Sequence, residues 1–225
     1  MDKSTLLIWP FVLVAGCIAG TLFAAETLAP VKIELPQPFF GGTPLDYWSS
    51  NLEPKSTEPR KPFMAPEGVG LISGGKPVSM DEDAFIYSGE LKQLVDGSKD
   101  YFRENLIEMG PGTHWVQVDI EKEHAVHAVV LWHFHEGQRV YFDVVIQVSN
   151  DPKFKEGVTT LFNNDVDNSS KLGEGKNKEY IESYEGRLFD AKGAKGRYVR
   201  CYSNGNTASD LNHYIELEVY GKALE

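Results

Sequence analysis

Residues 115–120 read Trp115-Val116-Gln117-Val118-Asp119-Ile120, and this stretch decides the fold class. Every second residue is apolar, which is the pattern of a β-strand with one face in a core. The same alternation recurs further along the chain, at Phe142, Val144, Ile146 and Val148 and again at Ile215, Leu217 and Val219. Residues 127–131 are apolar nearly throughout, as in a strand covered on both sides. With no convincing long amphipathic helix, these strands predict an all-β fold, a two-sheet β-sandwich or jelly roll.

The segment before the strands has a different composition. Eight of the twelve prolines fall within residues 29–68, which predicts an extended, semi-rigid arm. Two interpretations remain open: a spacer that separates the sandwich from a membrane, or a strap that packs on the sandwich or on a partner. The strap interpretation depends on aromatic residues that a solvated linker does not need: Phe39, Phe40, Tyr47, Trp48 and Phe63.

The N-terminus predicts export. Residues 5–25 form 21 consecutive residues without a charge, enough to cross a bilayer as a helix. Three alternatives remain: an uncleaved transmembrane anchor, a lipoprotein signal in which Cys17 of Val14-Ala15-Gly16-Cys17 is lipidated, or a cleaved signal peptide. We therefore predict a membrane-anchored protein that faces the periplasm or the cell exterior. Its parts are residues 1–28, the anchor or signal segment; 29–68, the Pro-rich aromatic arm; and 69–225, the sandwich.

Charge and cysteine content exclude some classes of partner and bond. The chain has 33 acidic and 22 basic residues and a formal net charge of -11, so its field repels phosphate backbones, and we expect no nucleic-acid partner. A disulfide between Cys17 and Cys201 would join a membrane segment to a folded domain, so we expect none. Val199 and Cys201 share a strand face, which predicts that Cys201 is a small buried side chain.

Six short motifs follow one another in an order typical of one family. They are Gly75-Lys76-Pro77-Val78, Leu94-Val95-Asp96-Gly97, Trp115 to Ile120, Val148-Ser149-Asn150-Asp151, Gly196-Arg197-Tyr198-Val199-Arg200, and Ile215 to Gly221. In this order and spacing, residues 69–222 resemble the discoidin, or coagulation-factor type C, group of galactose-binding-like jelly rolls. The resemblance implies a non-catalytic domain that recognises carbohydrate, phospholipid headgroups or proteins through loops at one end of the barrel.

The resemblance also implies a structural calcium ion. By position it nominates Asp96, Ser98 and Glu216 as ligands, and oxygen ligands of this kind suit calcium. Ser98 departs from the family pattern, since relatives often place Asp or Asn there. The alternative is that Asp96 only shapes an Asx turn before Gly97. We predict no organic cofactor.

Other polar residues are candidate sites of chemistry. His127, His133 and His135 have the same strand parity and could share a metal, although hydrogen bonding at a sheet end is the favoured interpretation. Residues 165–169 carry alternate oxygen side chains, typical of either a second cation loop or a polar turn. The chain contains neither Gly-x-Ser-x-Gly nor His-Glu-x-x-His, and we predict that it is not an enzyme.

Two functions follow from these features. The first is a module that binds glycan or cell-envelope material, with contacts chosen by loop position and polar chemistry: Arg139, Asn204, Asn206, Asn212 and His213. His135 or Tyr141 would supply an aromatic platform for a sugar ring. The alternative is an accessory subunit of a membrane or periplasmic protein complex, docking through the arm and the sandwich.

Overall fold

The computed structural model describes residues 26–39, 46–56 and 58–224. The predictions for residues 1–25, including the lipidation of Cys17, lie outside the described residues. Within the described ranges, no helix is both long and apolar enough to cross a membrane. The regular elements are strands β1 (Leu28–Pro30), β2 (Met64–Pro66), β3 (Gly70–Leu71), β4 (Val78–Met80), β5 (Ile86–Ser88), β6 (Ile107–Pro111), β7 (His114–His133), β8 (Val145–Ser149), β9 (Thr159–Asn163), β10 (Arg187–Ser203) and β11 (Leu211–Ala223), with 3-10 helices η1 (Leu91–Val95) and η2 (Arg103–Asn105).

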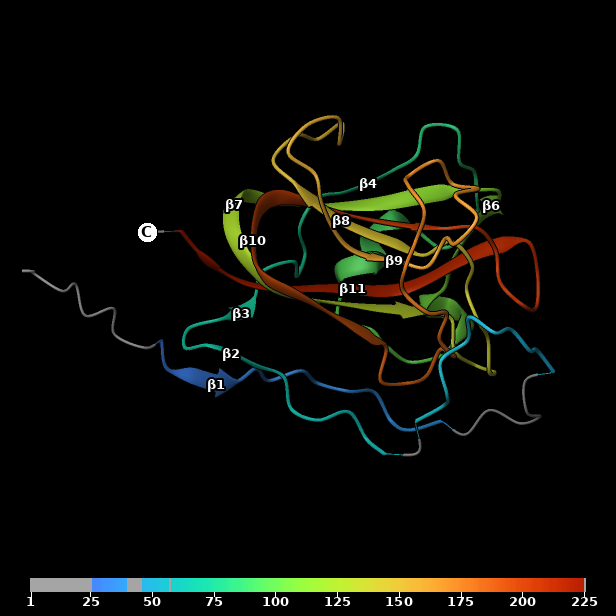
Figure 1. The fold of residues 1–225 in the computed structure, drawn as a ribbon, viewed down its shortest axis with the longest axis horizontal. Helices are drawn as coiled ribbons and strands as arrows, with labels where there is room; N and C mark the ends of the chain where they lie inside the picture. The colour runs from blue at the N-terminus through green and yellow to red at the C-terminus, as the bar shows by residue number, and fades with distance from the viewer. Residues whose placement is uncertain (1–25, 40–45, 57, 225) are drawn as a thin grey trace, which may run out of the picture.

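The fold is an all-β antiparallel sandwich, as predicted (Figure 1). The strands β5-β6-β11-β7-β10-β8-β9 form one hydrogen-bonded path, with β3 beside β11 and β4 beside β7. Strands β7 and β10 belong to both layers: the first half of β7 pairs with β4, and its second half pairs with β11. Between the halves Glu121 has a φ of 65°, which breaks the regular strand geometry. The sheet therefore folds over on itself and encloses a core.

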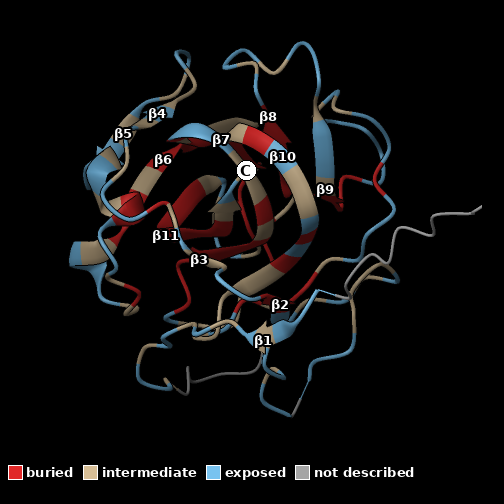
Figure 2. Cartoon of the chain, turned by 90° about the vertical axis from the view of Figure 1, so that its left-hand side faces the viewer, coloured by how far each residue is buried: buried red, intermediate tan, exposed pale blue. Residues whose placement is uncertain are grey.

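The core contains the residues that the alternating pattern predicts. Val116, Ile146 and Leu217 are each 0% exposed and belong to one apolar cluster between the layers. Val199 and Cys201 join the same cluster, which confirms that Cys201 is a buried apolar group, and burial raises the pKa of its thiol. Figure 2 shows this buried interior enclosed by the bent strands β7 and β10.

A second apolar cluster lies on the outer face of β7 and β11. Val130, Trp132 and Ile215 form part of it, and side chains from the arm pack on it, including Val31, Ile33 and Phe63. The ends of the arm are joined by the β1–β2 ladder, in which Ala29 pairs with Ala65. The arm therefore packs on the sandwich as a strap, and the spacer interpretation is not needed for these residues.

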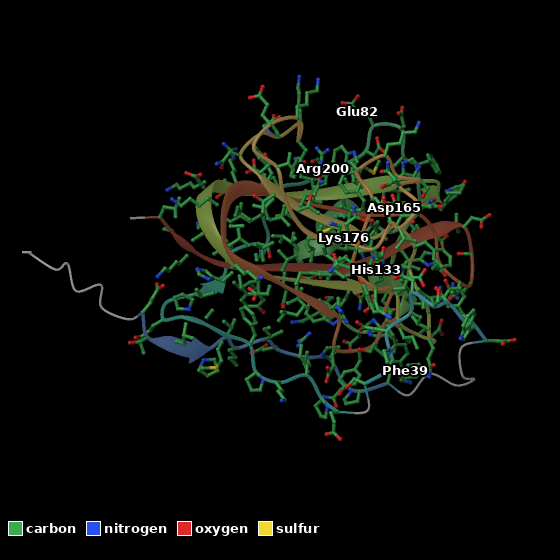
Figure 3. All side chains as sticks on the ribbon, viewed as in Figure 1. Phe39, Glu82, His133, Asp165, Lys176 and Arg200 are labelled. Atoms are coloured by element: carbon green, nitrogen blue, oxygen red, sulfur yellow. The ribbon has the colours of Figure 1, made fainter. Side chains whose placement is uncertain are left out.

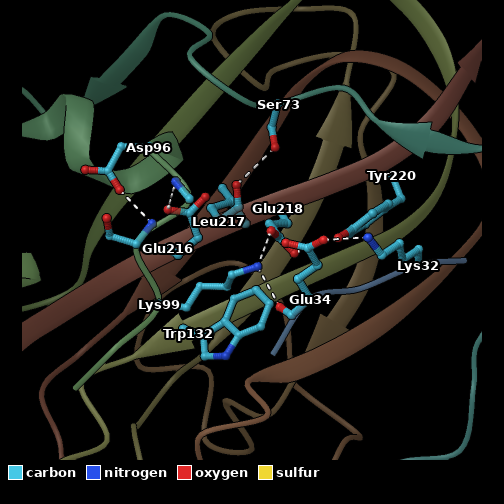
Figure 4. A network of polar contacts seen from close by, with 12 residues as sticks. Lys32, Glu34, Ser73, Asp96, Lys99, Trp132, Glu216, Leu217, Glu218 and Tyr220 are labelled. Atoms are coloured by element: carbon cyan, nitrogen blue, oxygen red, sulfur yellow. Dashed lines mark hydrogen bonds and ion pairs between the residues drawn. The ribbon is translucent and has the colours of Figure 1, made fainter. Parts of the chain in front are cut away.

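A buried ion pair within the sandwich also contacts the arm (Figure 4). Lys99 Nζ lies 2.7 Å from Glu218 Oε1 and donates a hydrogen bond of 2.6 Å to the backbone oxygen of Glu34. The second oxygen of Glu218 accepts from the Tyr220 hydroxyl at 2.7 Å. Because both charges are removed from water, each needs these partners, and the arm supplies one of them.

Candidate functional site

A row of polar side chains crosses the outer face of the β5-β6-β11 layer. Ser88 on β5 pairs with Glu108 on β6, and Glu108 pairs with His213 on β11. Successive residues of a strand point to opposite faces, so Glu108 and His213 face away from the core that holds Met109 and Tyr214. We call Glu108 and His213, together with Arg139 beside them, the polar row.

His213 is the centre of the polar row and is itself buried, at 4% exposed, so Glu108 and Arg139 are the members that a ligand would reach. Its Nδ1 lies 3.3 Å from Arg139 Nη1 and 3.4 Å from Asn206 Nδ2, and both of these nitrogens can only donate. Nδ1 is therefore an acceptor and the ring is neutral, with its proton on Nε2. Nε2 lies 3.2 Å from Glu108 Oε2, outside hydrogen-bonding geometry. Burial, and then the charge of Arg139, lower the pKa of His213 to about 4, so the ring stays neutral at pH 7.

Arg139 is held in place, and among the described residues the hydrogen bond found for its guanidinium goes to His213. Its guanidinium lies 4.9 Å from the ring centroid of Phe134, where cation–π attraction is favourable. Among the described residues, it forms no ion pair with a carboxylate. Arg103, which lies over the same ring at 5.7 Å, forms only a long 3.7 Å pair with Glu136. The polar row thus places a guanidinium at one nitrogen of the His213 ring and a carboxylate at the other.

The structure brings together four of the seven residues predicted to contact a ligand: Arg139, Tyr141, Asn206 and His213. Tyr141 is 1% exposed and stacks on His133, with ring centroids 4.1 Å apart, while its hydroxyl donates to the Phe134 oxygen. The prediction that Tyr141 is a sugar platform is therefore wrong in this conformation, because no face of its ring is open. Asn206 is 5% exposed and bonds its own loop through Leu211 O and Ala208 N.

The other three predicted contacts lie elsewhere. Asn212 is 0% exposed and points inward, where its amide bonds Ser203, Gly205 and Gly110, so the prediction that it contacts a ligand is wrong. Asn204 donates to Asp143 Oδ2 at 2.8 Å, on a different loop. His135 is 5% exposed, with Nδ1 3.0 Å from the His133 oxygen, so its ring is no open platform either.

The predicted calcium loop has features that suit a cation (Figure 4). Glu216 is 2% exposed, and one hydrogen bond to its carboxylate is found, from the Gly97 nitrogen at 3.1 Å. Burial raises its pKa to about 8, and the neighbouring charges of Glu218 and Asp96 contribute. Asp96 also accepts from the Ser98 nitrogen at 2.8 Å, which is the Asx turn of the alternative interpretation. A buried carboxylate with so few donors and two acidic neighbours fits a bound cation.

The other metal candidates differ in their geometry. Among the described residues, His127, His133 and His135 do not meet as a ligand group. His133 instead pairs its Nδ1 with Glu182 Oε2 at 3.0 Å, as the structural interpretation predicts. Ligand atoms of Asp143, Asp165 and Asp167 do lie within 4.8 Å of one another. Asp165 is already bonded to Ser169 and Ser170, as in a polar turn.

A cavity of about 860 Å³ separates the arm from the sandwich. Phe39, on the arm below the sandwich in Figure 3, lies at one side of it together with His135. Its arginines are already bonded within the protein. Arg187 forms a bidentate ion pair with the Glu53 carboxylate. Arg60 donates hydrogen bonds to the backbone oxygens of Glu185 and Gly186. Both arginines of the cavity are therefore bonded to groups of the protein itself.

The comparison with protein families agrees with this architecture. Residues 93–201, from η1 to the end of β10, match the model described as "NedA-like, galactose-binding domain", of the F5/F8 type C group. The sandwich is a galactose-binding-like domain of the discoidin type. The predicted family is thereby confirmed for the sandwich. Among curated proteins, the sequence has no significant match.

Several solved structures are similar to this discoidin-type domain. A family 89 glycoside hydrolase from Clostridium perfringens is 17% identical with a TM-score of 0.50, over 68% of this chain and 15% of that one. A chitosan-binding module from a Paenibacillus sp. IK-5 chitosanase/glucanase is 20% identical with a TM-score of 0.44, over 67% and 98% of the two chains. The lectin binding domain of lectinolysin, complexed with Lewis b, is 19% identical with a TM-score of 0.46, over 68% and 96%. At 17% identity, the likeness to the hydrolase shows the fold alone.

Sequence reasoning missed Glu108, the acidic member of the polar row. One signal was available, since a lone charge between the apolar residues Ile107 and Met109 must face away from the core. That signal does not identify the residue opposite it. The contact with His213 requires the register of β6 against β11, which the sequence does not provide.

Proposed function

We propose that this discoidin-type domain is a non-catalytic module that binds glycan through the polar row. The observation that carries the proposal is the contact chain Arg139–His213–Glu108 on an outer face of the sheet. The description of the matching family as a galactose-binding domain supports the same ligand class. The proposal names no nucleophile or catalytic base, because binding needs none.

The polar row has the chemistry that sugar hydroxyls require. Each hydroxyl donates one hydrogen bond and can accept others, so a site needs donors and acceptors side by side. Arg139 supplies donors and Glu108 supplies carboxylate acceptors. His213 accepts from Arg139 and is fixed as the neutral tautomer. Because these groups are ordered before binding, less conformational entropy is lost when a ligand arrives.

We also propose that calcium binds between Asp96 and Glu216, with Ser98 nearby. Calcium would add positive charge at the buried Glu216 carboxylate, beyond the charge of Lys99, and would stabilise the loop after η1. Support comes from the burial of Glu216 and from its acidic neighbours. The expected role of calcium is structural. Glu216 lies on β11 three residues after His213, so an ion bound at Glu216 would stabilise the strand that carries His213.

The uncharged residues 5–25 support a further proposal, that the domain acts outside the cytoplasm while tethered to a membrane. Glycans of the cell envelope would then be within reach. The alternative role as a subunit of a complex loses part of its motivation, because Val31, Ile33 and Phe63 of the arm are covered by the sandwich itself. Trp48 is not covered in this way, at 86% exposed.

A glycan array followed by calorimetry tests the proposal. The full chain, with calcium present, is expected to bind at least one oligosaccharide, and Arg139→Gln is expected to weaken that binding at least tenfold. The matched control is Arg197→Gln, which removes an arginine that is paired with Asp119 on the other layer and should leave binding unchanged. No binding to any envelope polysaccharide, or equal binding by Arg139→Gln and the wild type, would contradict the proposal.

A further inference from the structure

Two exposed aromatic rings lie at the edge of the same sheet. Phe85 is 65% and Tyr87 59% exposed, and their rings make an edge-to-face contact with centroids 5.2 Å apart. Tyr87 lies in β5 and Phe85 directly precedes this strand, so both lie outside residues 93–201, which match the family model. Large exposed aromatic side chains side by side are uncommon on a soluble surface and mark sites of recognition.

Local backbone geometry directs these rings outward. In the β5–β6 pair, Ile86 is opposite Met109 and Ser88 is opposite Glu108, so Tyr87 is an extra residue, a β-bulge. Ile86 keeps its place against the core, while Tyr87 turns away from it. A side chain on Gly110 would begin 3.8 Å from Tyr87 Cε2, so the ring lies over this glycine. The Gly110 nitrogen donates to the Phe85 oxygen at 2.9 Å, which fixes the segment.

The aromatic pair is continuous with the polar row. Glu108 and Gly110 lie two residues apart on β6 and therefore on the same face. Tyr87 covers Gly110, and Glu108 contacts His213 on the next strand. Neighbouring strands are about 4.8 Å apart, so β5 and β11 are separated by about 10 Å across the sheet. That span exceeds a single pyranose ring.

We propose that Tyr87 and Phe85 form a second subsite, which stacks one ring of an oligosaccharide while another ring binds the polar row. This inference rests on the proposed function and specifies its ligand as an oligosaccharide rather than a single terminal sugar. The apolar face of a sugar ring packs on an aromatic ring, while its hydroxyls remain available to Ser88 and Glu108. The subsite replaces the platform that sequence reasoning placed at His135 or Tyr141, whose rings are covered.

Calorimetry with ladders of galacto-, chito- and manno-oligosaccharides, from one to six residues long, tests the subsite. For the wild type, affinity is expected to rise with chain length. Tyr87→Ala should lower the affinity for the longer members about tenfold and leave the affinity for the monosaccharide unchanged. Phe85→Ala should act in the same direction. Trp48→Ala removes a more exposed aromatic residue of the arm and is the matched control.

The outcomes separate this inference from the proposed function. Equal losses by Tyr87→Ala for every ladder length, or no loss at all, would overturn the subsite while glycan binding by the polar row stands. If no ladder binds the wild type, the proposed function fails and the subsite fails with it. Size-exclusion chromatography completes the test, because a dimer that Tyr87→Ala converts to a monomer would assign the aromatic pair to a contact between two copies.

Discussion

His213 should make the stability of the fold depend on pH in a defined window. Its pKa is about 4 in the folded protein, against 6.5 for the free side chain. Between these values the unfolded chain binds the proton and the folded chain does not, so stability rises with pH across the window. The His213 contribution is complete above pH 6.5 and is lost as pH falls toward 4. A difference of about 2.5 pKa units means that the free energy of unfolding changes by on the order of 3 kcal/mol across this window.

Urea denaturation at pH 4, 5, 6 and 7 measures this contribution. His213→Asn removes the titrating ring, so the difference in unfolding free energy between the wild type and the variant should shrink steadily from pH 7 to pH 4. His124→Asn, on the bend of β7, is the control and should keep the slope of the wild type. Parallel pH profiles for the wild type and His213→Asn would refute the reasoning about burial and the Arg139 charge.

Three further predictions concern the loop, the arm and one glycine. Calcium should raise the melting temperature of the wild type but not of Glu216→Gln, which differential scanning calorimetry measures; an equal rise in both would exclude Glu216 as a ligand. Phe63→Ala should lower the free energy of unfolding by about 2 kcal/mol and speed proteolysis of the arm, because Phe63 packs on the outer cluster. Unchanged cleavage would show that the strap is not held there. Gly186→Ala should destabilise the fold by more than about 2 kcal/mol in urea titrations, since its φ is 61° and a Cβ would lie 2.6 Å from Trp132 Cε2; wild-type stability would contradict this close approach.

The sequence predicts the sandwich well because apolar residues at every second position indicate which face of a strand is buried. Val116, Ile146 and Leu217 are far apart in the chain, yet each lies in a run in which every second residue is apolar, and all three meet in the core. The arm was less predictable. Val31 and Ile33 lie in a proline-rich segment, and nothing local shows that they pack on a cluster whose members include Ile215, more than 180 residues later.

The candidate site was predicted only in part, for a geometric reason. Arg139 and His213 were chosen by loop position and polar chemistry, and the structure places them in contact. Asn212 was chosen by the same criteria, but it neighbours His213 in a strand and therefore points to the opposite face. Strand parity could have excluded one of the two. Glu108 and Tyr87 depend on strand register and on a β-bulge, which composition and spacing do not reveal.

The central claim is that the polar row of the outer face, and not the cavity under the arm, holds the glycan. Titrating the isotope-labelled full chain with the oligosaccharide that calorimetry identifies, and following backbone amide shifts by NMR, tests it most directly. The largest shifts are expected at Glu108, Arg139 and His213. Shifts confined to cavity residues such as Tyr184 and Arg187, with the polar row unchanged, would contradict it.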